Sequence, residues 1–259
     1  MFVDSHNHLL DYLEKLYKKD NFTKEELLLA YDNLEVIFCT SSNEEIRFTK
    51  QEAICNLLNS NVHPFHSFGI HPQAPSLLEI PFLEKLLKLK KIVAIGECGF
   101  DLFDDKNRLT IEQQKEVWNI QLELAIKYDM PIIIHCRHAL HLIFKSTLSL
   151  KKIKAVIFHG WAGSFLEATS ILKRKINAYF CIGKALLRGQ KSQIEMASKF
   201  ELKHLLTETD APYMKLKDEN YSKPCDIKIV SNYTSLLRKI NTQELNKQLY
   251  ENFQNVFLI

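Results

Sequence analysis

The sequence alternates short apolar stretches with amphipathic stretches along almost its whole length. Eight stretches rich in β-branched and aromatic residues predict strands, beginning with residues 1–3 and continuing at 35–40, 63–71, 92–97, 131–135, 155–159, 177–183 and 204–210. Because apolar residues at helical spacing separate them, we expect helices between the strands. Eight such units in 259 residues predict an α/β protein with a (β/α)8 TIM barrel rather than an open doubly wound sheet.

Two helical segments of the chain refine this prediction. Residues 110–128 form a long amphipathic pattern, with Thr110 as the expected N-cap and Gln113 in place for a capping box. Residues 226–259 predict two final helices, and Thr242 is the expected cap of the second. We therefore expect an extra C-terminal helix on a barrel that need not be regular.

Two absences from the sequence limit the alternatives. No G-x-G-x-x-G loop follows the first predicted strand, which disfavours a dinucleotide-binding fold. No low-complexity linker or short-period repeat divides the chain, so residues 1–259 are expected to form a single barrel domain.

The composition is that of an ordinary globular protein, 46% hydrophobic and 25% charged. A net charge of +3 does not by itself identify a nucleic-acid-binding protein, but it is compatible with a local basic surface. The six cysteines are scattered, with no C-x-x-C pair, which favours reduced thiols in a cytoplasmic protein over a disulfide framework. With no evident signal peptide or bilayer-length apolar run, we expect no membrane association, and no obligate protein partner is evident.

Two histidines, His6 and His8, follow the first apolar residues of the chain. Residues two apart on a strand project from the same face, so these two imidazoles are expected to converge. Imidazole binds zinc, manganese, iron and nickel, and two from one strand would supply half of a metal site. The pair alone fits ordinary polar histidines as well, so a metal site needs ligands from elsewhere in the chain.

Histidines and acids also stand where other predicted strands end. Glu97 ends the fourth strand, His135 the fifth, His159 the sixth and Asp210 the eighth. The carboxyl ends of barrel strands lie on one face, where active sites are built. Each residue alone could be a satisfied polar side chain or a helix cap, but coincidence is a poor explanation for the whole set. The sequence therefore predicts a metal site at one mouth of the barrel.

Six segments of the chain, taken in order, carry a resemblance to a known family. They are residues 4–8 (DSHNH), 69–72 (GIHP), 96–101 (GECGFD), 131–137 (PIIIHCR), 159–164 (HGWAGS) and 207–213 (TETDAPY). With the closing segment 252–257, they resemble the motifs of the TatD family of metal-dependent deoxyribonucleases, which belongs to the amidohydrolase-like TIM-barrel hydrolases. The resemblance covers nearly the whole chain and implies a metal-dependent hydrolase barrel.

The resemblance also implies two divalent metal ions per chain, and zinc, manganese, magnesium, iron and nickel all stay open. One metal would be held by His6, His8, Glu97 and Asp210, and the other by Glu97, His135 and His159. Glu97 would bridge, because a carboxylate has two oxygens and can hold two neighbouring cations. A hydroxide between the metals would attack the substrate, with Glu97 and Asp210 as catalytic residues and Asp210 taking the proton.

Three further residues are candidates for contact with the substrate. His71 would contact the substrate or a water on a metal. Arg137 lies two residues beyond His135 and could fork onto a phosphate oxygen, or else form a salt bridge at the rim. Trp161 could stack on a base, although a tryptophan in such a loop is as often a packing residue.

Other polar residues near the motifs have supporting roles in this interpretation. Asp101 and Glu208 would orient a histidine or a loop. The basic side chains after the seventh and eighth predicted strands could flank a phosphate backbone, or simply be solvated; these are Lys184, Arg188, Lys215 and Lys217. Gln73 stands where the family often has a second histidine, which affects the substrate groove and no predicted ligand.

The leading functional hypothesis is a metal-dependent hydrolase of DNA phosphodiester bonds, an exonuclease that prefers single strands, as the family resemblance implies. The same ligands would serve an esterase or deacylase, for example one that removes a D-amino acid from tRNA. A shallow basic channel would favour DNA, whereas a closed pocket would favour a small acyl group. The third alternative is a barrel that only binds a partner; loss of a ligand would be its mark, and no ligand is missing.

Overall fold

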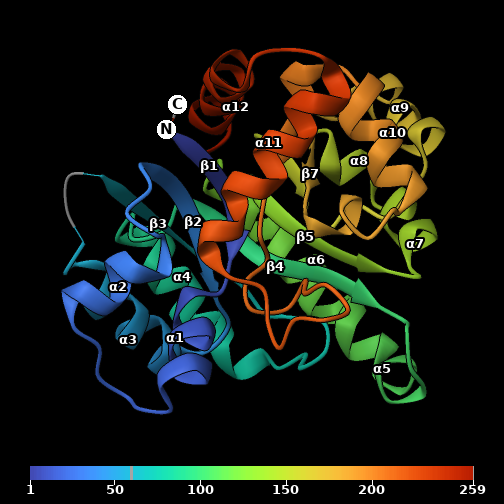
Figure 1. The fold of residues 1–259 in the computed structure, drawn as a ribbon. Helices are drawn as coiled ribbons and strands as arrows, with labels where there is room; N and C mark the ends of the chain where they lie inside the picture. Colours follow the sequence, from blue (N-terminus) through green and yellow to red (C-terminus); the bar gives the residue numbers. More distant parts are fainter. Residues whose placement is uncertain (59–60, 259) are drawn as a thin grey trace.

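The computed structural model describes residues 1–58 and 61–258, and it forms a (β/α)8 barrel (Figure 1). All eight strands belong to one parallel sheet, in the order of the sequence. The strands are β1 (Phe2–Asn7), β2 (Val36–Ser42), β3 (Val62–Phe68), β4 (Ala94–Asp101), β5 (Ile132–Arg137), β6 (Val156–Phe158), β7 (Ala178–Ile182) and β8 (Leu205–Thr207). The predicted fold class is confirmed.

The barrel is irregular at the seam between β1 and β8. Within the described residues these two strands share no regular ladder and are joined by separate hydrogen bonds instead. The backbone N–H of Asp210 donates to the carbonyl of His6 at 3.0 Å, and the Thr207 hydroxyl donates to the carbonyl of Val3 at 2.6 Å. These bonds hold the first and last strands together and place Asp210 beside His6.

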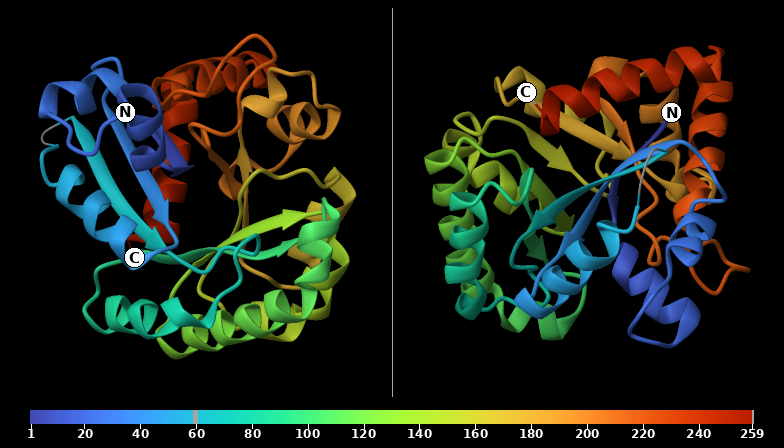
Figure 2. Two further views of the ribbon diagram at one scale, coloured as in Figure 1. Left: turned by 90° about the horizontal axis from the view of Figure 1, so that it is seen from below. Right: turned by 90° about the vertical axis from the view of Figure 1, so that its left-hand side faces the viewer.

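Helices surround the strands, as the two views in Figure 2 show. They are α1 (Leu9–Tyr17), α2 (Lys24–Ala30), α3 (Glu45–Cys55), α4 (Ile80–Lys88), α5 (Asp105–Leu109), α6 (Ile111–Lys127), α7 (Leu140–Lys145), α8 (Thr147–Leu150), α9 (Phe165–Lys173), α10 (Lys191–Lys199), α11 (Ile227–Arg238) and α12 (Thr242–Phe257). Short 3₁₀ turns occur at η1 (Leu77–Glu79), η2 (Lys184–Leu186), η3 (Leu202–His204) and η4 (Pro224–Asp226).

The expected C-terminal helix, α12, packs near the amino ends of the strands. Its Phe253 is fully buried with Val3 and Ile37, which come from the starts of β1 and β2. In Figure 1 the two chain ends lie beside each other next to α12. Apolar side chains thus fill the amino end of the barrel. Functional polar groups are expected at the opposite end, where the strands have their carboxyl ends.

One predicted helix cap is confirmed in position but not in its bonds, and the other is wrong. Thr110 is the N-cap residue of α6, as predicted, but its side chain makes no capping bond, so the capping box expected with Gln113 does not form. Its hydroxyl donates instead to the carbonyl of Asn107, in the unexpected helix α5. Asn241, rather than Thr242, caps α12 by accepting from the N–H of Gln243.

Other boundaries also differ from the predictions. The third strand ends at Phe68, so His71 lies in the loop that follows. Ile259, the expected last residue of the final helix, lies outside the described residues. No helix in the described ranges combines the length and apolar character needed to cross a membrane. That the whole chain makes up one domain stays a prediction.

Candidate metal centre

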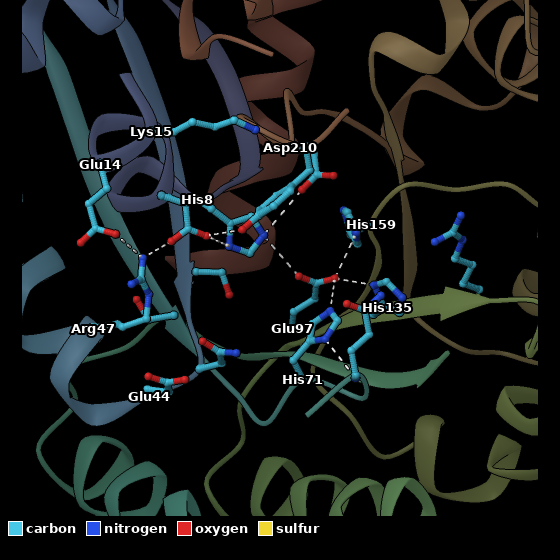
Figure 3. Close-up of a pocket in the computed structure, with 17 residues that line it drawn as sticks. His8, Glu14, Lys15, Glu44, Arg47, His71, Glu97, His135, His159 and Asp210 are labelled. Atoms are coloured by element: carbon cyan, nitrogen blue, oxygen red, sulfur yellow. Dashed lines mark hydrogen bonds and ion pairs between the residues drawn. The ribbon is translucent and has the colours of Figure 1, made fainter. Parts of the chain in front are cut away.

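The six predicted ligands gather at the carboxyl ends of the strands, together with His71. Figure 3 shows His71 and five of these ligands, all but His6, around one cavity. His6 lies on β1, Glu97 on β4 and His135 on β5, while His8, His71, His159 and Asp210 follow β1, β3, β6 and β8. The strand β1 ends at Asn7, so the alternation expected to align His6 and His8 does not reach His8. The two imidazoles still converge, with ring centroids 4.9 Å apart.

Glu97 is the centre of the cluster, and one of its oxygens faces His6 and His8. Oε2 lies 3.3 Å from Nε2 of His6 and 3.3 Å from Nε2 of His8. Asp210 completes this side, because its Oδ1 lies 3.8 Å and 3.6 Å from the same two nitrogens. Two imidazoles and two carboxylates thus converge from β1, β4 and the segment after β8.

The other oxygen of Glu97 faces a second group of histidines. Oε1 lies 2.6 Å from Nδ1 of His135, 3.2 Å from Nε2 of His159 and 3.2 Å from Nε2 of His71. Figure 3 shows Glu97 between His8 on one side and His135, His159 and His71 on the other. The carboxylate therefore separates two sets of nitrogen atoms, one at each oxygen.

Glycines on both sides of Glu97 let β4 approach β5 closely at this point. Gly96 and Gly99 have φ values of +129° and +133°, which side chains rarely adopt. A Cβ at either position would collide with the carbonyl oxygen of Ile133 or His135 on β5. The G-E-C-G motif is therefore what allows Glu97 and His135 to stand so close together.

Buried carboxylates orient two of the histidines from behind. Nε2 of His135 lies 3.0 Å from Asp101, and Nδ1 of His159 lies 3.3 Å from Glu208. When such an imidazole is neutral, the nitrogen that donates to the outer carboxylate carries the proton, so the nitrogen that faces Glu97 keeps its lone pair. Gln73 supports Asp101 through a 2.7 Å hydrogen bond from its amide. The supporting positions predicted for Asp101 and Glu208 agree with this geometry.

The electrostatics of the cluster follow from burial and from mutual charges. Burial raises the pKa of Glu97, but the positive charges of His71 and His159 outweigh it and hold that pKa well below its usual value. Burial lowers the pKa of His8, yet the hydrogen bond to Glu97 and the charge of Asp210 raise it to about 9. For Asp210, burial dominates and raises the pKa to about 6. Imidazolium and carboxylate charges thus offset one another in a buried space.

His6 gives the clearest sign that the cluster suits a cation. Its side chain is fully buried, and neither ring nitrogen makes a hydrogen bond within the described part of the chain. Burial, reinforced by His159, lowers the pKa of His6 to about 4, so near pH 7 the ring is neutral and offers a lone pair. A buried polar atom without a partner is unfavourable unless a ligand satisfies it. The residues present therefore fit a divalent metal ion.

Within the part of the chain that the structure describes, three sets of side chains bring their ligand atoms within 4.8 Å of one another. The sets are His6, His8 and Glu97; His6, His159 and Asp210; and His71, Glu97 and His135. A family model described as TatD related DNase matches residues 3–258. The chain belongs to this family.

Known TatD proteins resemble this family member in sequence and in fold. A 3'-5' ssDNA/RNA exonuclease TatD from Erwinia tasmaniensis is 31% identical over 210 residues, or 76% of each chain. The solved structure of YJJV, a TatD homolog from Escherichia coli, matches with a TM-score of 0.80 at 25% identity, covering 100% of this chain and 98% of the other. A TatD family hydrolase from Entamoeba histolytica has a TM-score of 0.79 at 20% identity, covers 99% and 98%, and supports the fold alone.

The metal-centre candidates of this TatD family member open into a cavity of about 840 Å³. We call it the central cavity. His71 and Arg137 line it, as expected for residues that contact a substrate. The guanidinium of Arg137 lies 3.4 Å from the ring centre of Phe103 and forms no salt bridge within the described residues, so the rim salt bridge is not present there.

Two residues predicted near the substrate are buried instead. The indole of Trp161 is only 3% exposed and packs against Phe158 and Phe180, which favours the packing alternative over stacking on a base. Lys184 is 1% exposed, and its ammonium pairs with Glu219 and Asp226 at 2.5 Å, which removes it from the group that could flank a phosphate backbone.

The sequence analysis did not predict a polar network where α1 and α3 line the central cavity. Arg47 on α3 pairs with Asp11 and Glu14 on α1, and the hydroxyl of Tyr213 donates to Asp11 at 2.6 Å. Among the residues of this network, Tyr213 alone belongs to a sequence motif, the segment 207–213 that contains Asp210. The other members carry no sequence signal, because charged residues on helices are ordinarily solvated.

Proposed function

We propose that this protein is a metal-dependent hydrolase that cleaves phosphodiester bonds of nucleic acid, and that it acts as an exonuclease on single-stranded DNA. The proposal rests on the position of the Glu97 carboxylate between two groups of histidines. Its Oε2 faces His6 and His8, and its Oε1 faces His135 and His159. Membership of the TatD related DNase family and the relatives named as ssDNA/RNA exonucleases support the reaction and the substrate class.

In this proposal the cluster holds two divalent metal ions. One set of ligands is His6, His8, Glu97 and Asp210, and the other is Glu97, His135 and His159, with Glu97 common to both. When bound, two adjacent cations lower the pKa of water toward neutrality and stabilise negative charge on the attacking and leaving oxygens. The ligand types suit zinc, manganese, iron or nickel, and magnesium stays possible.

The protein's own side chains then have separate tasks in the reaction. Asp210 accepts the proton of the water that attacks phosphorus, because its carboxylate faces the same space as His6 and His8. Arg137 donates to a phosphate oxygen from the edge of the central cavity, where the ring of Phe103 supports its guanidinium. His71, beside Glu97 and exposed to the cavity, contacts the substrate near the scissile bond.

The alternative functions receive less support. A deacylase of small acyl groups would need a closed pocket, whereas the central cavity is large and adjoins a second one along Tyr213. A barrel that only binds a partner would not need the paired ligand sets around Glu97. No feature of the described residues favours either alternative specifically.

Removal of metal tests the proposed function. Protein treated with a chelator is expected to lose hydrolysis of labelled single-stranded DNA, and activity should return with a divalent ion because the reaction needs the cations. Duplex DNA, single-stranded RNA and D-aminoacyl-tRNA are assayed in parallel with several metals. Chelator-resistant turnover, or turnover of the aminoacyl ester alone, would contradict the proposal.

The Glu208→Gln variant tests the role of the carboxylate behind His159. The oxygen that accepts from the Gly160 N–H at 2.7 Å must stay an oxygen, so the new amide NH2 faces Nδ1 of His159. That nitrogen then has to accept, and the proton moves to Nε2, where it blocks the lone pair that faces Glu97. We expect metal affinity to fall about 10- to 100-fold.

Titration of metal-free protein with metal, followed by calorimetry, measures this change. The matched control is Glu167→Gln, which keeps the capping box with Ser164 because glutamine also serves at that position. Equal metal affinity in Glu208→Gln and the wild-type protein would show that Glu208 does not orient a ligand.

A further inference from the structure

A second cavity adjoins the central cavity, and Tyr213 lines both. It has a volume of about 740 Å³ and lies between the loops that follow β7 and β8. Arg188, Lys215 and Lys217 line it, with Asp218 as the one acid among its lining residues. All three cations are exposed, and none forms a salt bridge within residues 1–58 and 61–258. We call this cavity the basic groove.

Tyr213 stands at the junction of the two cavities with its ring held in place. Its hydroxyl donates to Asp11, and its ring meets the ring of His8 edge to face, with centroids 5.1 Å apart. More than half of the side chain, 57%, is nevertheless exposed. An exposed aromatic ring that is already fixed in position can stack on a base without ordering a flexible side chain.

Buried ion pairs anchor the loop that carries Tyr213, Lys215 and Lys217. The buried ammonium of Lys184 pairs with Glu219 and Asp226, and Glu219 also accepts from the N–H of Leu216 at 2.8 Å. Lys184 thus directs its charge into the protein and ties the loop after β8 to the turn after β7. The exposed cations of the basic groove therefore rest on a fixed backbone.

We propose that the part of the strand that is not being cleaved leaves the metal centre over Tyr213, where a base stacks, and continues along the basic groove. This path rests on the proposed function and adds the route of the substrate to it. The charges along the two cavities favour it. Where α1 and α3 line the central cavity, the acids Asp11, Glu14 and Glu44 stand beside Lys15 and Arg47, and Arg47 pairs with two of the acids. The basic groove instead has three cations, which form no salt bridge within the described residues, against Asp218. A phosphate backbone is therefore attracted more strongly to the basic groove.

Binding measurements on a variant of the basic groove test the path. Metal-loaded protein is titrated against a fluorescent 12-nucleotide single strand with phosphorothioate linkages at its ends to prevent cleavage, and anisotropy is followed at several salt concentrations. In Arg188→Gln/Lys215→Gln/Lys217→Gln we expect weaker binding and a slope of log affinity against log salt that is smaller by about 2, since each phosphate contact contributes about 0.7 on a single strand.

The matched control removes the same charge from the other end of the barrel. Lys151, Lys152 and Lys173 are exposed and precede β6 and β7, so Lys151→Gln/Lys152→Gln/Lys173→Gln should keep the wild-type affinity and salt slope. Circular dichroism verifies that both triple variants are folded. The same affinity and slope in the two triple variants would overturn the path.

Variants of Tyr213 test the stacking step separately. Tyr213→Ala should bind the strand about tenfold or more weakly, because one stacked base contributes about that much. Tyr213→Phe keeps the ring and should keep most of the affinity. On a strand whose terminal nucleotides lack bases, the alanine variant should bind as the wild-type protein does. An equal loss on both strands, or no loss on either, would contradict stacking.

The wild-type protein separates the failure of the path from the failure of the proposed function. Its hydrolysis of bis(p-nitrophenyl) phosphate, a small diester, depends on the metal centre and does not need the basic groove. If that diester and the DNA strand are both left intact, the proposed function fails. If the strand is cleaved while the groove variant binds as its control does, only the path fails. Absence of strand binding by the wild-type protein would also overturn the path.

Discussion

Replacing Glu97 with alanine is expected to abolish hydrolysis of single-stranded DNA. The loss should exceed the roughly 100-fold effect of removing an outer hydrogen-bond partner of a metal ligand. The reason is that Glu97 serves both halves of the cluster, with Oε2 3.3 Å from His6 and Oε1 2.6 Å from His135. Initial rates on a labelled strand at saturating metal, with the metal content of the purified variant, measure the effect.

Two further variants make this result specific. Glu97→Gln keeps the size of the side chain but replaces one ligand oxygen by an NH2 group, so it should lose activity while disturbing the buried cluster less. Glu123→Ala changes an exposed glutamate on α6 and should keep the wild-type rate. Wild-type activity in folded Glu97→Ala would exclude a bridging role for this carboxylate.

The second large effect is expected for Asp210→Asn. Asparagine keeps an oxygen that can face His6 and His8, but its amide does not accept the proton of the attacking water. We expect kcat to fall by about 10²- to 10⁴-fold, the range typical of a lost general base. Rates are measured over a range of metal concentrations, because a pure loss of metal affinity would be corrected by excess metal, whereas a lost base would not.

The control for this substitution is Asp129→Asn. Asp129 is exposed with a φ of +51°, a conformation that asparagine also tolerates, so the change should leave the rate unaltered. Recovery of the full rate of Asp210→Asn at high metal would assign Asp210 to metal binding alone.

The fold and the gathering of the candidate ligands could be predicted from the sequence, because both follow from one periodic pattern. Alternation of strands and helices predicts the barrel, and the barrel places every strand end at one mouth. Glu97, His135 and His159 lie at or just after such ends, so their proximity in space follows from their order in the chain. The end of β1 was not predicted correctly. The strand ends at Asn7, so His8 does not lie on it as the alternation of strand residues implied.

Side chains in the loops could not be predicted in this way, because their burial depends on distant partners. Lys184 follows a strand as a phosphate-contacting lysine would, yet acids 35 and 42 positions later turn its ammonium inward. Trp161 lies within the segment that begins at His159, but Phe158 and Phe180 enclose its indole. The role proposed for Tyr213 depends on its exposure and on its bond to Asp11, and both follow from the tertiary structure and not from the local sequence.

A crystal structure of the metal-loaded protein, with anomalous scattering recorded at the absorption edge of the metal, tests the central claim most directly. We predict two peaks on opposite sides of the Glu97 carboxylate. One should lie among Oε2, His6, His8 and Asp210, and the other among Oε1, His135 and His159. A single peak, or metal bound without contact to Glu97, would contradict the two-metal centre.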